Sequence, residues 1–164
     1  MNKRKVPLQK PGRSKQDYQT PPEFLAAVKQ LLGINEFAVD LAASATNTAA
    51  AKFYDESISS LSQVWRTAVG QWAWLNPPYG DLKVWVRAAW GARHDANIAM
   101  LVPAGVGSNW WRDYVHQKAL VYLLNGRITF VGQPTCYPKD CCLLLYGRAI
   151  LPRYEVWDWR GRGR

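Results

Sequence analysis

The chain has 164 residues, a formal net charge of +9 at pH 7 and three cysteines, Cys136, Cys141 and Cys142. This length suits a single domain with a sizeable core, and the odd number of cysteines, without paired spacing, argues against a disulfide framework or a zinc site. No apolar run is long enough to span a membrane, and the basic start of the chain lacks the apolar core of a signal peptide. We therefore expect a cytoplasmic protein with reduced thiols, no metal and no membrane partner.

Positive charge is concentrated at the two ends of the chain. Residues 1–20 hold six lysines and arginines against one aspartate, and residues 148–164 hold five arginines against two acids. Basic ends on a nearly neutral middle are typical of segments that follow a phosphate backbone, although solubilising tails explain single charges about as well. We expect a flexible basic arm over residues 1–16, a single domain over residues 17–159 and a basic tail over residues 160–164.

The first helix is expected to begin near Thr20. The segment Thr20-Pro21-Pro22-Glu23 has the composition of a capping box, with Thr20 as the cap and Pro21 at the first helical position. Residues 24–32 follow with apolar side chains at helical spacing, and Gly33 ends the helix.

A short apolar strand over residues 37–41 follows, with Asp40 near its end and the small residues Ala42 and Ala43 after it. In doubly wound α/β folds, ligands bind beyond the carboxyl ends of the strands, and small residues leave room for them. We expect Asp40 to lie at such a site, while a helix cap or a solvated strand end is the alternative. A helix is expected over residues 47–53.

The chain between residues 41 and 72 is shorter than two complete helix–strand units usually are. We therefore expect the sheet to be abbreviated on this side. Asp55 and Glu56 in this connection are candidates for binding a ribose, but ordinary surface charges would have the same pattern.

The most informative stretch is residues 72–80, an apolar strand that ends in Asn76-Pro77-Pro78-Tyr79. Proline has no backbone donor, so strand pairing stops at Asn76 and the chain leaves the sheet in a stiff loop. The Asn76 side-chain oxygen and the Pro77 carbonyl are then two neighbouring acceptors, and Tyr79 offers a ring face. Such a site suits the exocyclic amine of a nucleobase, because bonds to both N–H groups favour a nitrogen with a usable lone pair. A proline turn that caps a strand is the alternative.

Helices and strands alternate after this turn. We expect a helix over residues 82–93, a buried strand over 97–103, a helix capped by Ser108, and strands over 120–124, 128–131 and 141–146. Asn125-Gly126 lies between two of these strands and is the strongest hairpin signal in the chain. The pattern predicts an α/β fold whose sheet is mainly parallel with a C-terminal antiparallel hairpin.

Asn76-Pro77-Pro78-Tyr79 after an apolar strand resembles the catalytic motif of N6-adenine DNA methyltransferases that use S-adenosyl-L-methionine. Residues 126–130 resemble a late segment of the phage-type members, which are compact. The resemblance implies a Rossmann-like class I methyltransferase sheet, S-adenosyl-L-methionine as the cofactor and adenine in DNA as the target, flipped out of the duplex onto Tyr79. A phage-encoded protein would act in the host cytoplasm.

The resemblance also implies roles for individual residues. It implies catalytic roles for Asn76, Pro77, Pro78 and Tyr79, and cofactor contacts for Thr20, Pro21, Asp40, Ala42 and Ala43. We further expect DNA contacts from Lys83, Arg112, Arg127 and Phe130. The last two would approach either the DNA or the flipped base, although a hairpin with one exposed charge explains them nearly as well. The glycine-rich pattern common in larger relatives is missing after Asp40.

Two other functions are open at this point. The same fold and motif can methylate adenine in RNA or a glutamine amide in a protein, and the basic ends favour nucleic acid. The missing glycines would also suit a DNA-binding relative without catalysis. The target sequence and the oligomeric state are not indicated.

Overall fold

The structure is a computed structural model and describes residues 18–161. The helices in chain order are α1 (Pro22–Leu32), α2 (Leu82–Ala92) and α3 (Asn109–Tyr114), with short 3-10 helices η1 (Glu56–Ile58), η2 (Ser60–Ser62) and η3 (Tyr79–Asp81). The strands are β1 (Val39–Asp40), β2 (Ala73–Leu75), β3 (Ile98–Pro103), β4 (Leu120–Asn125), β5 (Cys141–Tyr146) and β6 (Arg153–Asp158). None of these helices is long and apolar enough to cross a membrane.

The six strands form one sheet in the order β1-β2-β3-β5-β4-β6. β1, β2 and β3 pair in parallel, and so do β4 and β6, whereas β5 is antiparallel to both of its neighbours, β3 and β4. Five strands therefore run in one direction and β5 runs in the other. The expected α/β fold with a mainly parallel sheet and antiparallel pairs is confirmed at this level.

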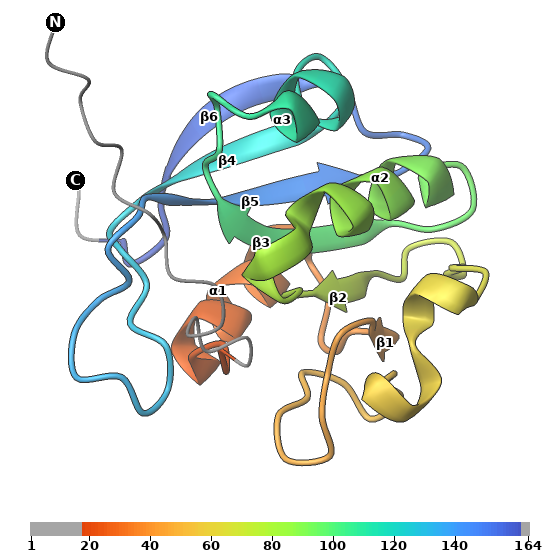
Figure 1. Cartoon of the computed structure of the whole chain (residues 1–164), viewed down its shortest axis with the longest axis horizontal. Helices are drawn as coiled ribbons and strands as arrows, with labels where there is room; N and C mark the ends of the chain where they lie inside the picture. The colour runs from red at the N-terminus through yellow and green to blue at the C-terminus, as the bar shows by residue number, and fades with distance from the viewer. Residues whose placement is uncertain (1–17, 162–164) are drawn as a thin grey trace, which may run out of the picture.

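Both faces of the sheet are covered. Alternate side chains of β3 point to opposite faces, so Met100 packs in the core beneath α2 and α3, whereas Leu101 packs in the core beneath α1. Figure 1 shows α2 lying along the sheet, with α1 well separated from α2. The two helices pack against opposite faces of the sheet. All six residues of β3 and of β5 are buried, as expected for central strands covered on both faces.

Several local predictions are confirmed. α1 ends at Gly33, whose φ of 67° is left-handed. Ser108 caps α3 by accepting a hydrogen bond from the Trp111 backbone N–H at 3.3 Å. Between β1 and β2 the described chain has two 3-10 helices and no α-helix, as the expected abbreviation requires.

The predicted hairpin around Asn125-Gly126 is wrong. Gly126 has a φ of 101° and turns the chain out of the sheet, so residues 128–131 form no strand. β4 instead pairs with β5, after a connection that spans residues 126–140. Ile128 and Phe130 give the segment an alternating pattern because both side chains enter the α1-side core, and a buried loop shares this pattern with a strand.

Two other elements differ from expectation. The helix predicted over residues 47–53 is absent; a turn at residues 44–47 and a parallel bridge between Asp40 and Phe53 take its place, so this segment extends the sheet edge beyond β1. β6 was not predicted, because an edge strand carrying Arg153 and Glu155 lacks a regular apolar pattern. The predicted arm at residues 1–16 lies outside the described residues, as do the last three residues of the predicted tail.

Candidate active site

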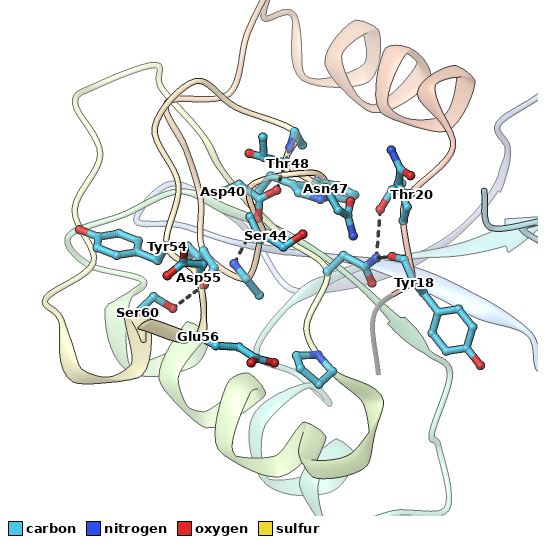
Figure 2. A pocket seen from close by; sticks show the side chains of 18 of the residues that line it. Tyr18, Thr20, Asp40, Ser44, Asn47, Thr48, Tyr54, Asp55, Glu56 and Ser60 are labelled. Carbon is cyan, nitrogen blue, oxygen red and sulfur yellow. Dashed lines mark hydrogen bonds between the residues drawn. The ribbon is translucent and has the colours of Figure 1, made fainter. Parts of the chain in front are cut away.

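A cavity of about 490 Å³ lies beyond the carboxyl ends of β1 and β2. Six of the predicted site residues line it: Thr20, Asp40, Ala42, Ala43, Asn76 and Pro78. Figure 2 shows Tyr18 and Thr20 on one side of this cavity and Asp55 and Glu56 on the other. One space therefore joins the end of the Asp40 strand to the Asn-Pro-Pro-Tyr loop.

The Asn76 side chain is held by three hydrogen bonds. Its Nδ2 donates to the Tyr18 carbonyl oxygen at 2.7 Å and to the Thr20 hydroxyl oxygen at 3.0 Å, and its Oδ1 accepts from the Tyr79 hydroxyl at 3.1 Å. Both N–H groups are therefore in use, while Oδ1 keeps a second lone pair. The side chain thus presents an acceptor, not a donor, to any further partner.

Thr20 does not cap α1 as predicted. Pro21 takes the N-cap position without a side-chain hydrogen bond, and its carbonyl accepts from the Phe24 and Leu25 N–H groups. The Thr20 hydroxyl is directed to Asn76 instead, and the residue is only 6% exposed. Thr20 lines the cavity, whereas Pro21 does not.

Asp40 organises the loop that follows β1. Its Oδ1 accepts from the Ala42 N–H at 3.1 Å and its Oδ2 from the Ala49 N–H at 2.8 Å. The Ala43 N–H is also used, since it donates to the Tyr54 carbonyl at 2.9 Å. Burial raises the pKa of Asp40 to about 6, against the opposing effect of the two backbone N–H groups. Asp40 therefore shapes the wall of the cavity, and its charge is costly there.

The two acids after the Phe53 bridge differ in their surroundings. Asp55 caps η1 and accepts from the N–H and hydroxyl groups of Ser57, whose hydrogen bonds hold the pKa of the Asp55 carboxyl below its usual range. Glu56 lines the cavity and is exposed, and no hydrogen bond or ion pair engages its carboxylate within residues 18–161. Both carboxylate oxygens of Glu56 are therefore available to a ligand, whereas Oδ1 of Asp55, which also lines the cavity, is occupied by its bonds to Ser57 and Ile58.

Tyr79 belongs to an aromatic cluster that we define as Tyr18, Tyr79, Phe130 and Tyr137. Its ring centroid lies 5.8 Å from that of Tyr18, 6.3 Å from Phe130 and 5.7 Å from Tyr137. Burial raises the pKa of the Tyr79 hydroxyl well above its ordinary value, so this group stays a hydrogen-bond donor. Neither Tyr79 nor the buried Pro77 lines the cavity, whereas Asn76 and Pro78 do.

Phe130 differs from its expected role. It was expected to approach DNA or the flipped base, but the residue is 1% exposed and its ring centroid lies 4.8 Å from that of Tyr18. In this position it supports the aromatic cluster and presents no surface to DNA.

The three cationic residues expected to contact DNA are exposed and lie outside the cavity. Arg112 pairs with Asp113 at 2.7 Å, and Arg127 pairs with Asp140 at 3.2 Å. The carboxyl of Asp113 has a lowered pKa, mainly through its hydrogen bond with Arg112 and to a smaller degree through Lys83. Lys83 and Arg112 therefore share one region of the surface, and Arg127 lies on a different loop.

Two residues of the site were not predicted. Tyr18 supplies the carbonyl that binds Asn76, and Tyr137 completes the aromatic cluster. A backbone carbonyl leaves no mark in a sequence, and Tyr137 stands out only as an aromatic residue in a polar loop. Within the part of the chain that the structure describes, no group of three or more His, Cys, Asp or Glu side chains is placed to hold a metal.

The chain is similar to known proteins over most of its length. Residues 9–142 match the model of the family described as DNA N-6-adenine-methyltransferase (Dam). A protein of that name from Escherichia phage T1 is 28% identical over 113 residues, which cover 68% of this chain and 46% of the phage protein. Another, from Haemophilus phage HP1, is 28% identical over 108 residues, which cover 64% of this chain and 61% of the relative. The aligned part thus spans less than two thirds of either relative. Since the family model covers most of the sequence, the chain belongs to the DNA N-6-adenine-methyltransferase (Dam) family.

Proposed function

We propose that the protein transfers a methyl group from S-adenosyl-L-methionine to N6 of adenine in DNA. The observation that carries this proposal is the single cavity that is lined both by Asp40 at the end of β1 and by Asn76 at the end of β2. Its volume of about 490 Å³ falls within the usual range of small-molecule sites. A ligand beyond the carboxyl ends of parallel strands is the arrangement of doubly wound sheets, which supports a Rossmann-like class I methyltransferase fold.

The lining of the cavity fits the proposed cofactor. The Glu56 carboxylate is free to accept hydrogen bonds from the hydroxyls of a ribose, and Ala42 and Ala43 leave space beside the strand end. Asp40 contributes a carboxyl group to the lining, which a cationic part of the ligand could approach. When bound, S-adenosyl-L-methionine supplies an electrophilic methyl group attached to a sulfonium.

Asn76 and Pro77 would act on the amine of the target base. The second lone pair of Asn76 Oδ1 can accept one N–H of the amine, and the Pro77 carbonyl can accept the other. Both bonds strengthen as positive charge develops on the nitrogen, so they stabilise the transition state more than the ground state. The motif needs no ionised base before transfer, because the nitrogen lone pair itself attacks.

An adenine inside a duplex could not reach Asn76, so we infer that the target base is flipped out. Tyr79 donates to Asn76 and is partly exposed although it does not line the cavity, so it would supply the aromatic face for this base beside the cavity. Lys83, Arg112 and Arg127 are exposed and would contact the phosphate backbone, although the two arginines must exchange their acidic partners to do so.

Transfer of a labelled methyl group from S-adenosyl-L-methionine to DNA, RNA and ribosomal protein tests the proposal directly. Label in DNA, recovered as N6-methyladenine after digestion, is the expected result. Label in RNA alone or in protein alone would show that the protein methylates that acceptor and not DNA. Calorimetric titration with S-adenosyl-L-methionine tests the cofactor separately, and the absence of binding heat would identify an inactive relative.

A further inference from the structure

We propose that Thr20 is a positioning residue that, with the Tyr18 carbonyl, fixes which face of the Asn76 amide meets the substrate, and that this pocket accepts asparagine but not ionised aspartate. The effect on catalysis that we infer rests on the proposed function. Its structural part, the orientation of the amide, stands on the three hydrogen bonds of Asn76 alone.

The chemistry of an amide makes its orientation decisive. A side-chain amide can be rotated by a half turn, which exchanges its acceptor oxygen and its donor nitrogen. The amine of adenine also brings N–H donors, so a rotated Asn76 would set donors against donors. The orientation of this one side chain therefore determines whether the site can bind the amine at all.

The surroundings of Asn76 allow one orientation only. The Tyr18 carbonyl is purely an acceptor and lies 2.7 Å from Nδ2, so a rotated amide would bring two oxygens together. Thr20 takes the second N–H of Nδ2 at 3.0 Å. Thr20 is 6% exposed, so water does not readily replace it. Losing its hydroxyl would leave a poorly solvated N–H without a partner.

The same surroundings disfavour a charged side chain at position 76. An aspartate would place a carboxylate oxygen against the Tyr18 carbonyl, where Nδ2 now lies. The titratable groups nearby are Tyr79 at its hydrogen bond, Tyr18 in the aromatic cluster, and Asp40, Tyr54, Asp55 and Glu56 in the cavity lining. The lining contains no Lys, Arg or His among the described residues. An aspartate there would be favoured in its protonated form, which can donate to Tyr18 and still accept from the amine.

Steady-state kinetics on Thr20 variants test the positioning role. Thr20→Val keeps the shape and removes the hydroxyl, and we expect kcat to fall by roughly tenfold to a hundredfold, the effect of leaving a buried donor unpaired. The KM for S-adenosyl-L-methionine should change by no more than about twofold, because the hydrogen bond acts on the other substrate. Thr20→Ser should restore most of kcat. An unchanged kcat in Thr20→Val, or a loss confined to the cofactor KM, would refute the role, and so would equal losses in the serine and valine variants.

Nuclear magnetic resonance tests the same hydrogen bonds without any activity. The side-chain NH₂ signals of Asn76 can be assigned by their disappearance in Asn76→Asp. In Thr20→Val one of the two protons should move to a lower chemical shift, and in Thr20→Ser it should stay in place. Unmoved signals in the valine variant would contradict the contact. Thr20→Ala replaces the valine variant if thermal unfolding shows that valine is not tolerated.

The pH profile of Asn76→Asp tests the second part. We expect this variant to keep activity only at acidic pH and to lose it as pH rises through an elevated carboxyl pKa, while the wild type lacks this descending limb. Wild-type-like activity of Asn76→Asp at pH 8 would refute the exclusion of aspartate. If the wild type itself methylates no acceptor, the proposed function fails, whereas the NMR result still decides the orientation of the amide.

Discussion

Asp40 makes the stability of the protein depend on pH in a direction that can be measured. Its carboxyl is 4% exposed, and burial raises its pKa from the ordinary 3.8 to about 6. The folded protein therefore binds a proton more tightly than the unfolded chain does. The stability from this group is complete below about pH 4 and is lost as pH rises through about 6.

The size of the effect follows from the two pKa values. The difference between 3.8 and about 6 corresponds to about 3 kcal/mol of unfolding free energy, lost between acidic and neutral pH. The substitution Asp40→Asn puts a side chain that cannot ionise at this position and should abolish this contribution. The amide has one acceptor oxygen for the two N–H groups of Ala42 and Ala49, so the substitution adds a cost of roughly 1–3 kcal/mol that does not vary with pH.

Urea unfolding of the wild type and Asp40→Asn at pH 4, 5, 6 and 7 measures the difference. The unfolding free energy of the wild type, relative to that of Asp40→Asn, should fall as pH rises across this window. Asp55→Asn is the matched control: because the pKa of Asp55 is lowered from 3.8, its stabilisation is already present at pH 4, and the difference between wild type and Asp55→Asn should stay nearly constant across this window. A difference between wild type and Asp40→Asn that stays constant, or grows with pH, would show that Asp40 is not the buried acid described above.

Three further predictions concern catalysis, the basic arm and the C-terminal strand. Asn76→Ala should abolish methylation and leave the binding of S-adenosyl-L-methionine, measured by calorimetry, intact. Asn109→Ala, at an exposed asparagine, is the control and should change neither. Parallel loss of cofactor binding in Asn76→Ala would contradict a role in the transition state. Deleting residues 1–15 should reduce the slope of log affinity for DNA against log salt concentration by up to roughly five, since the segment has six cationic residues. An unchanged slope would show that the arm does not contact DNA. Trp159→Ala should lower the free energy of unfolding in urea by about 3–5 kcal/mol, because the indole ring centroid lies 5.0 Å from that of Phe24 and its N–H donates to the Gly126 carbonyl. Trp159→Phe keeps an aromatic ring and should lower it much less. Equal losses in the two variants would show that ring packing does not stabilise the protein here.

The elements that could be predicted are those in which local chemistry and burial agree. Gly33 ends α1 because its left-handed backbone favours glycine, and Ser108 caps α3 because its oxygen meets an unpaired N–H. β3 was predictable because a strand covered on both faces is continuously apolar. β6 was missed because an edge strand is paired on one side and needs little apolar surface.

Two of the predicted site residues, Asp40 and Asn76, line one cavity, whereas the capping role expected of Thr20 is wrong. Asp40 was placed from the rule that ligands lie beyond strand ends, and Asn76 from the proline turn that ends its strand; one cavity joins them. Thr20 was expected to cap α1 and, from the family resemblance, to contact the cofactor; instead of capping, its hydroxyl binds a side chain 56 residues further along the chain. Capping is a local interaction that a sequence displays, whereas a contact across that separation depends on how the whole chain folds.

The wrong hairpin is informative about the site itself. Local rules favour a tight turn at Asn125-Gly126, and the chain instead forms the long connection that carries Phe130 and Tyr137 against Tyr79. A hairpin would have kept both rings in or beside the sheet and left Tyr79 with Tyr18 as its aromatic neighbour but without these two. Departures from local preference persist only where the tertiary structure compensates for them, and the burial of Ile128 and Phe130 in the α1-side core offers that compensation. The aromatic support of the Asn-Pro-Pro-Tyr loop thus depends on the same departure that local patterns failed to predict.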